Sequence, residues 1–464
     1  MDAEETRVAK RAPKGPKSHA GGDEQPAQTG VTRRALLLGG VGAVAVAGLV
    51  TPDTATAAPS AGGGLRNASA NTGATSALDF TTREAFEAVY DHLDGGPPLD
   101  TDNLAGVLGW QVQYILLAYL QMYIAHRDVA YLDRFIERAD AALNQRDHIQ
   151  GVEDYRGLSL PGWSRDQYAQ FPGSMHLPVE TGNIVRPIAW FARIVASTPQ
   201  LRQTSRFGDR VQPYTQAAID AVAIHDEHWD DHEDGTGIYF FPKGSPHEVD
   251  GIQCAFNMNH TMGMAMMHLH ALTGDGAYLD KVQKMVRLFE SDRSPGAGDG
   301  YFWNYQWTGS WGFNGWTPAD NVSVNRASYP GNPAPEDFSH GALSMEFIAQ
   351  VWHERLGSQV RDLQSYAKTF DRTVVETDYG LDITRFIDGT GGIRDGRDAT
   401  HAGTWAVLAR HNPNIVSAAQ DIYAHYAFEF GASRTATMLA AISELNRFAA
   451  GGLAGPQGPF PPED

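Results

Sequence analysis

The residues best suited to chemistry recur at four places in the chain with one spacing. In each, a polar side chain is followed three positions later by His or Asn: Glu180 and Asn183, Asn257 and His260, Asp337 and His340, Asp398 and His401. Residues at i and i+3 share one face of a helix. If those faces point to one place, acids, amides and three histidines converge and can move protons on a bound substrate. The alternative is that each pair is an ordinary helix cap beside a histidine packed in the core.

An aromatic segment precedes the third pair. Eight of the sixteen residues from 301 to 316 are aromatic, and Gly309, Gly312 and Gly315 interrupt them, which predicts a loop. Flat rings beside a few polar groups are typical of a sugar-sized pocket, although such rings can also cover the edge of a core. The residues expected to bind substrate are Glu180, Asn183, Trp303, Tyr305, Trp307, Trp311, Trp316, Arg326, Tyr329 and Asp398.

The elements that must position these residues form a repeat. Residues 116–143 resemble residues 265–289, and both place Tyr-Leu-Asp at the start of a second helix. The first helix of each unit is apolar on nearly all sides, whereas the second carries charge on one face, so first helices should be inner and second helices outer. We therefore predict an all-α fold, an (α/α)5-6 toroid, with inner helices starting near residues 103, 180, 257, 338 and 399. Residues 432–448, with 81–93, could close a sixth unit.

Connections between the units are long. They span 147–178, 231–254, 292–335 and 378–397, whereas the turns inside units are short. Loops of this length in a compact domain are usually functional. We expect them all at the end of the toroid where the inner helices begin.

The ends of the chain suggest export. Residues 1–57 resemble a twin-arginine signal peptide, with Arg33 and Arg34 before an apolar run to Val50 and a small-residue cleavage site. That run is too short and too weakly apolar for a stable membrane anchor. We expect a flexible linker at 58–77, a catalytic toroid domain at 78–450, a disordered tail at 451–464, and a secreted protein that uses the twin-arginine export machinery.

Composition limits the partners. The formal charge of the chain is −19, and removing the predicted leader takes away seven basic and six acidic residues, which leaves −20. This charge disfavours nucleic acid as a partner. The single cysteine, Cys254, excludes an internal disulfide and is expected to be a buried apolar side chain.

The Asn257-Met258-Asn259-His260 stretch, on inner helices of a toroid with an aromatic groove, resembles toroid polysaccharide lyases and their uronate-epimerase relatives. The resemblance implies a poly- or oligosaccharide substrate and β-elimination or C5 epimerisation at a uronic acid. It implies that Asn257 or Asn259, with His260, neutralises the carboxylate. The catalytic set we expect is His260, His340, Asn257, Asn259, Asp337 and His401, without a cofactor. Carboxylate clamps are expected among Arg186, Arg326, Arg394 and Arg397.

Three other functions use the same residues. An inverting glycoside hydrolase needs a carboxylic acid and a base, for which the candidates are Glu180, Glu336, Asp337 and Asp398. A zinc enzyme could use His260, His340 and His401, and calcium could bind the acidic segment from His225 to Gly235. A non-catalytic carbohydrate-binding envelope protein needs only the aromatic rings.

Overall fold

Helices dominate the computed structural model, which describes residues 78–357 and 360–451. The predicted leader, the linker and the tail from residue 452 onward lie outside these residues. No helix in the described ranges is both long enough and apolar enough to cross a membrane.

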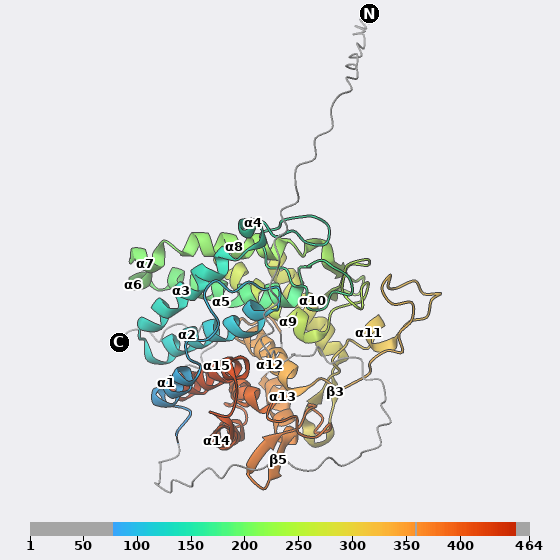
Figure 1. The fold of residues 1–464 in the computed structure, drawn as a ribbon. Helices are drawn as coiled ribbons and strands as arrows, with labels where there is room; N and C mark the ends of the chain where they lie inside the picture. Colours follow the sequence, from blue (N-terminus) through green and yellow to red (C-terminus); the bar gives the residue numbers. More distant parts are fainter. Residues whose placement is uncertain (1–77, 358–359, 452–464) are drawn as a thin grey trace, which may run out of the picture. The chain divides into compact units, whose positions relative to one another are not determined.

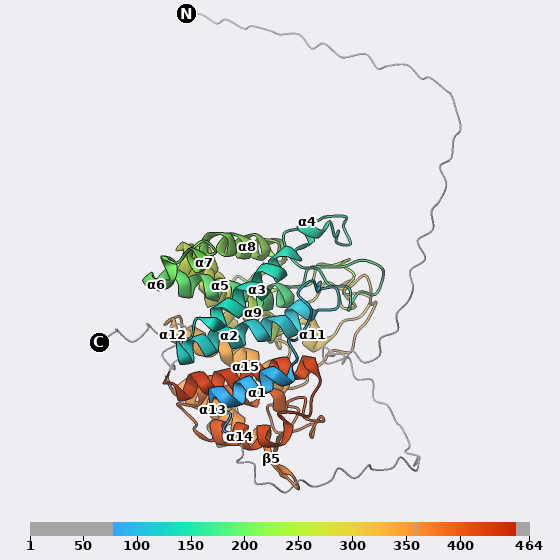
Figure 2. The same ribbon diagram turned by 60° about the vertical axis from the view of Figure 1, so that its left-hand side comes forward.

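Among the described residues, five helical hairpins and a sixth pair, made of the last helix and the first, form a closed ring (Figures 1 and 2). The inner elements, in order around the ring, are η1–α2 (Leu108–Val112 and Gln113–His126), α5 (Pro178–Ser197), α9 (Phe256–Thr273), α12 (Phe338–His353), η4 (Ala399–Leu408) and α15 (Ala432–Ala449). Each packs on the next, and α15 packs on α2 to close the ring. The predicted α/α toroid is therefore confirmed, and it has six units.

The outer helices cover this ring. They are α1 (Arg83–His92), α3 (Ala130–Asn144), α8 (Val211–Ala223), α10 (Gly276–Asp292), α13 (Val360–Thr373) and α14 (Asn414–Tyr426). Every residue of α9 from Phe256 to Leu269 is buried, whereas α10 buries one stripe and exposes the rest. This difference follows from the sequence, because a helix that is apolar on all sides needs protein on all sides. Short helices α4 (Asp147–Gln150), α6 (Pro199–Arg202), α7 (Ser205–Gly208) and α11 (Trp311–Asn314) lie in connections.

Two inner elements differ from the prediction. The first begins at Leu108 rather than near residue 103, because Gly106 has a positive φ of 75° and ends the preceding turn. Asn103 instead accepts a hydrogen bond from the N–H of Gly109. The fifth, η4, is a 3₁₀-helix. Its Gly403 lies so close to α15 that a Cβ there would meet the Ala441 carbonyl at 2.6 Å.

Extended structure is limited to three antiparallel pairs of short strands among the described residues. They are β1 (Trp229–Asp231) with β2 (Gly237–Tyr239), β3 (Ser294–Pro295) with β4 (Tyr301–Phe302), and β5 (Val374–Thr377) with β6 (Gly380–Ile383). The long connections meet each other: Ala169 pairs with His247, and Asp337 with Phe386. We call the end of the toroid where the inner helices begin, and where these connections gather, the mouth.

Close contact between α5 and α9 gives a test of the ring. A Cβ at Gly182 would meet backbone atoms of α9 at 2.5–2.6 Å, whereas a Cβ at Gly276 would meet nothing within 4 Å. Gly182→Ala should therefore lower the free energy of unfolding by about 1–3 kcal/mol. Gly276→Ala, the matched control at the start of α10, should be neutral or slightly stabilising. Urea denaturation measures both, and equal effects would show that the two helices are not in contact.

Candidate functional site

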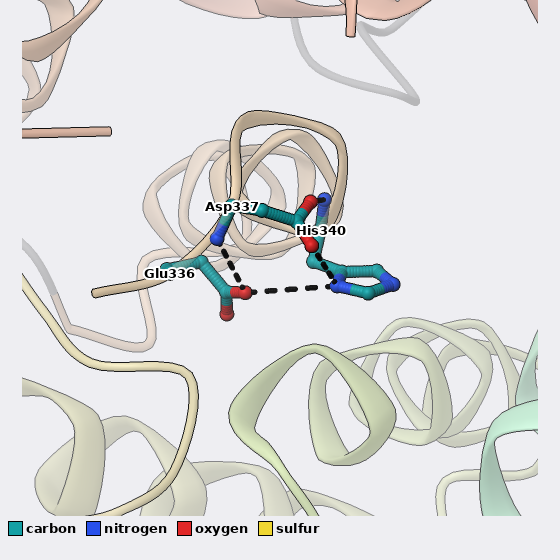
Figure 3. Close-up of side chains that lie close together, drawn as sticks. All are labelled: Glu336, Asp337 and His340. Carbon is teal, nitrogen blue, oxygen red and sulfur yellow. Dashed lines mark hydrogen bonds and ion pairs between the residues drawn. The ribbon is translucent and has the colours of Figure 1, made fainter. Parts of the chain in front are cut away.

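The start of α12 brings two carboxyl groups and a histidine together. Asp337 caps the helix, because its Oδ1 accepts a hydrogen bond of 3.0 Å from the backbone N–H of His340. Its other oxygen lies 2.8 Å from Nδ1 of the His340 ring, and Oε1 of Glu336 lies 3.8 Å from the same nitrogen. The opposite ring nitrogen, Nε2, points away from both carboxyl groups (Figure 3). A carboxylate on Nδ1 orients a histidine and stabilises its charged form.

The two neighbouring carboxyl groups differ in charge. Burial raises the pKa of Glu336 well above its usual value, and the charge of Asp337 adds to this effect. Burial would also raise the pKa of Asp337, but His340, Arg394 and the hydroxyl of Ser339 outweigh it and hold that pKa below its usual value. Glu336 is thus a neutral acid beside an ionised Asp337. Such opposite shifts in neighbouring groups are typical of acid–base sites.

The next inner element adds charge and a second imidazole. Arg394 forms an ion pair with Asp398 through two nitrogens, and one of them lies 3.8 Å from Asp337. Burial raises the pKa of Asp398 to about 6, although Arg394 opposes the shift. Burial lowers the pKa of His401 to about 3, so its imidazole is neutral. The ring of Tyr114, from α2, lies 5.9 Å from the His401 ring.

Only part of this mouth cluster, which comprises Glu336, Asp337, His340, Arg394, Asp398 and His401, reaches the surface. The side chain of His340 is 8% exposed and His401 is 9% exposed, whereas Glu336 is 0% exposed. A bound molecule would therefore meet Arg394, whose side chain is 21% exposed, before the buried imidazoles, and Glu336 last.

Several polar atoms near the cluster have no hydrogen-bond partner within the described protein. Tyr305 covers the cluster, with its ring centroid 5.4 Å from that of His340, and its hydroxyl lacks a partner. Nδ1 of His401 and Oε2 of Glu336 also lack one. Both amide atoms of Asn257 are buried and unpartnered, one residue after Phe256, whose N–H donates to the Tyr305 carbonyl. Buried polar groups without partners require an explanation, and a ligand with hydroxyl groups supplies one.

His260 does not join the other two histidines, contrary to the prediction. Its ring stacks on Phe347 of α12 at 4.4 Å and meets Phe289 of the outer helix α10 edge-on at 4.7 Å. Its Nδ1 lies 2.9 Å from the hydroxyl of Ser344, and burial lowers its pKa to about 3. The i, i+3 spacing predicted correctly that these residues lie on one side of a helix. The His260 side chain, however, points toward α12 and α10.

Three other predicted polar residues hold structural contacts. Glu180 accepts hydrogen bonds from Trp110 at 2.6 Å and Asn103 at 3.3 Å and forms an ion pair with Arg165. The amide of Asn183 donates to the Gly109 carbonyl. Asn259 accepts from the N–H of Tyr239 and donates to the Cys254 and Ala255 carbonyls, which fixes β2 against α9.

The aromatic segment is divided between core and surface. Trp303, Tyr305, Trp316 and Tyr329 are buried, contrary to the expected open platform. Trp316 packs on Tyr329 and donates to the Arg326 carbonyl, and the Arg326 guanidinium lies over the Tyr329 ring. Trp307 is half-buried, and Trp311 is 39% exposed.

The alternative metal site of His260, His340 and His401 is not assembled, because His260 packs on Phe347 and Phe289. Within the described ranges, one set of three potential ligands lies within 4.8 Å, and it consists of Glu336, Asp337 and His340. Arg394 lies 3.8 Å from Asp337, so the protein itself places a cation beside this set. In the predicted calcium segment, Asp231 pairs with Lys284, and Asp234 bonds to Thr236.

Sequence reasoning did not include Tyr114 or place Glu336 in the expected catalytic set. Tyr114 lies within an unbroken apolar helix and carries no local signal. Glu336 was predicted only as a candidate acid or base of the inverting glycoside hydrolase.

Comparison with solved structures supports the fold. A D-mannose isomerase matches 81% of this chain and 100% of its own, with a TM-score of 0.51 and 11% identity. The GH76A α-1,6-mannanase from Salegentibacter sp. HEL1_6 covers 80% of this chain and 99% of its own, with a TM-score of 0.47 and 11% identity. The cellobiose 2-epimerase from Spirochaeta thermophila DSM 6192 covers 79% and 96%, with a TM-score of 0.42 and 12% identity. No protein-family model and no curated protein matches the sequence.

The pKa of Glu336 is raised and that of Asp337 is lowered, so pH should affect the stability of variants at these two positions in opposite ways. A Glu336 carboxyl that stays protonated when folded makes the protein lose stability as pH rises above the usual value of 4.5. Glu336→Gln cannot ionise, so its melting temperature should exceed that of wild type, with a gap that widens from about pH 5 to about pH 8.

Asp337→Asn is the matched variant. The ionised Asp337 stabilises the fold above its usual pKa of 3.8, so the substitution should cost about 1–3 kcal/mol at neutral pH, and the cost should disappear as pH falls below that value. Thermal melts across pH measure both variants. Parallel curves for Glu336→Gln and wild type would contradict the neutral state of Glu336.

Proposed function

We propose that this chain is a carbohydrate-active enzyme whose mouth cluster transfers protons on a sugar. The observation that supports the proposal is the 2.8 Å contact between the Asp337 carboxylate and Nδ1 of His340, whose side chain is 8% exposed, with the neutral imidazole of His401 on the next inner element. One D-mannose isomerase has the same fold, and the unpartnered polar atoms of Tyr305 and Asn257 suit sugar hydroxyl groups.

The reaction that fits best is isomerisation or epimerisation next to a sugar carbonyl. Nε2 of His340 removes the proton from the carbon beside the carbonyl, and the Asp337 carboxylate stabilises the imidazolium that forms. The negative charge that develops on the carbonyl oxygen needs a donor. His401 is a neutral imidazole and can donate an N–H to that oxygen without first giving up a proton. In an isomerisation, His340 then returns the proton to the former carbonyl carbon, and the proton of the neighbouring hydroxyl passes to the former carbonyl oxygen. In an epimerisation, the proton returns to the carbon that lost it, on the opposite face.

A neutral sugar suits the site better than the uronic acid expected from the sequence. Two of the predicted carboxylate clamps already bind carboxylates of the protein, since Arg186 makes two bonds to Glu346 and Arg394 pairs with Asp398. Arg165 is likewise paired with Glu180. A uronate bound by Arg186, Arg394 or Arg165 would have to break one of these pairs, and a buried pair that loses one partner costs several kcal/mol. β-Elimination at a uronate therefore has the least support.

Glycoside hydrolysis is the second candidate, and it has better support than the lyase. The specific observation is the neutral Glu336 beside the ionised Asp337, because a hydrolase needs a protonated acid and a base in one site. Glu336 is fully buried, so this reaction requires Tyr305 or its loop to move aside. Secretion through the twin-arginine route, and activity without a cofactor, belong to the proposal in either case.

Turnover in deuterium oxide distinguishes the reactions. Wild-type protein incubated with D-mannose, D-glucose and cellobiose should yield an isomer or epimer with deuterium at the carbon beside the carbonyl, seen by NMR. His340→Asn should lower the rate by about 10²–10⁴-fold, as expected for loss of a general base. His148→Asn, which alters an exposed histidine elsewhere, should retain the rate. A chelator should leave the rate unchanged.

Hydrolysis gives a different result. New reducing ends from neutral oligosaccharides, without deuterium on carbon and lost in Glu336→Gln, would replace the isomerase assignment with a hydrolase. Products that absorb in the ultraviolet, formed from polygalacturonate, would instead restore the lyase.

A further inference from the structure

The loop that carries Trp307 and Trp311 leads outward from the mouth cluster. It folds as an irregular hairpin whose backbone rungs join Glu336 to Trp303, Tyr305 to Ala334, Asn332 to Gly312, and Trp316 to Tyr329, at 2.8–3.1 Å. The first rung lies at Glu336, and the second at Tyr305, which covers His340. Trp307 follows two residues later, within about 7 Å of Tyr305 along the chain. The two tryptophans therefore lie on a path that begins at the site.

The first arm of this hairpin is braced between the rungs at Tyr305 and Trp316. The Asp292 carboxylate at the end of α10 accepts bonds from the N–H and hydroxyl of Thr308. The Asn314 amide donates to the Thr308 and Ser310 carbonyls at 2.7 and 3.1 Å. Fixing an exposed aromatic loop in one conformation costs conformational entropy when the protein folds. Because the loop is already ordered, less entropy is lost when it binds a ligand.

The two indole rings are held in place by different contacts. Trp307 stacks on His232 with ring centroids 5.1 Å apart, and it lies so close to Gly309 that a Cβ there would meet the ring at 2.4 Å. The backbone N–H of Trp311 donates to the Gln253 side chain at 3.3 Å, while its side chain is 39% exposed. The loop thus presents one half-buried and one exposed indole ring, with the amides of Gln253 and Asn314 nearby. The pyranose ring has the same combination of an apolar face and hydroxyl edges.

We propose that Trp307 and Trp311 form a subsite for a neutral oligosaccharide whose end unit lies in the mouth cluster. The inference rests on the proposed carbohydrate activity and extends it, because it makes the substrate a chain rather than a free monosaccharide. We expect this oligosaccharide to be neutral because of the charges around the loop. Asp292 lies at the loop, Asp230 lies beside His232, and the chain carries a formal charge of −19. These carboxylates and the net charge disfavour a polyanion, although Arg326 lies on the same hairpin and Lys243 contacts it at Asn321.

Affinity electrophoresis of the full chain in gels that contain α-mannan, soluble xylan, mixed-linkage glucan or polygalacturonate tests this subsite. Wild type should be retarded by at least one neutral polymer and not by polygalacturonate. Trp311→Ala and Trp307→Ala should each weaken the interaction about tenfold, as for an aromatic anchor. The matched control is Phe428→Ala, because Phe428 is 45% exposed and lies outside this loop; it should bind as wild type does.

Several results would overturn the subsite: no retardation of wild type, unchanged binding by Trp311→Ala, or an equal loss in Phe428→Ala. Thermal melts check that each variant is folded. If Trp307→Ala unfolds, the binding of Trp311→Ala alone tests the subsite. His340→Asn separates this inference from the proposed function. It should lose turnover, and its retardation by the polymer should still weaken about tenfold when Trp311→Ala is added. Full turnover by His340→Asn, with the Trp311 effect on binding retained, would remove the catalytic assignment alone.

Discussion

The pairing of Asp337 with His340 is the interaction on which the mouth depends. One carboxylate oxygen caps α12 through the His340 N–H, and the other fixes the His340 ring. The same group lies 3.8 Å from Arg394, on the loop before η4. Because a buried carboxylate is costly unless it is paired, these contacts must form together. The Asp337 carboxylate therefore contributes to three features at once: the start of α12, the orientation of the His340 ring and the position of the loop before η4.

Glu336 is neutral for the same reason. A second negative charge beside Asp337 would need its own cation, and Arg394 is already engaged by Asp398. The carboxyl group therefore keeps its proton. Deeper in the ring, by contrast, two buried carboxylates each have a cation of their own. Arg186 and Glu346 form a bidentate pair, and Arg447 pairs with Glu444. Charges inside the toroid are balanced by the protein itself, which leaves hydrogen bonding, rather than net charge, as the means of recognising a substrate.

The fold was readable from the sequence because it repeats. An apolar helix followed by an amphipathic helix can bury its surface only with an inner and an outer layer, and six such units close a ring. Local irregularities were not readable. The late start of the first inner helix depends on the positive φ of Gly106, and the 3₁₀ form of η4 accompanies the close approach of Gly403 to α15. Both depend on neighbours distant in sequence.

The rotation of each helix decided which predicted residues share a site. Asn257 and His260 have the same spacing as Asp337 and His340, yet only the second histidine reaches the mouth. His260 lies one turn after Phe256 and stacks on it. Its two other aromatic neighbours, Phe347 and Phe289, come from other helices. A helix that is apolar on all sides carries no stripe that shows which face is inward. The spacing therefore located residues along the axis of the toroid, while packing between layers determined their direction around it.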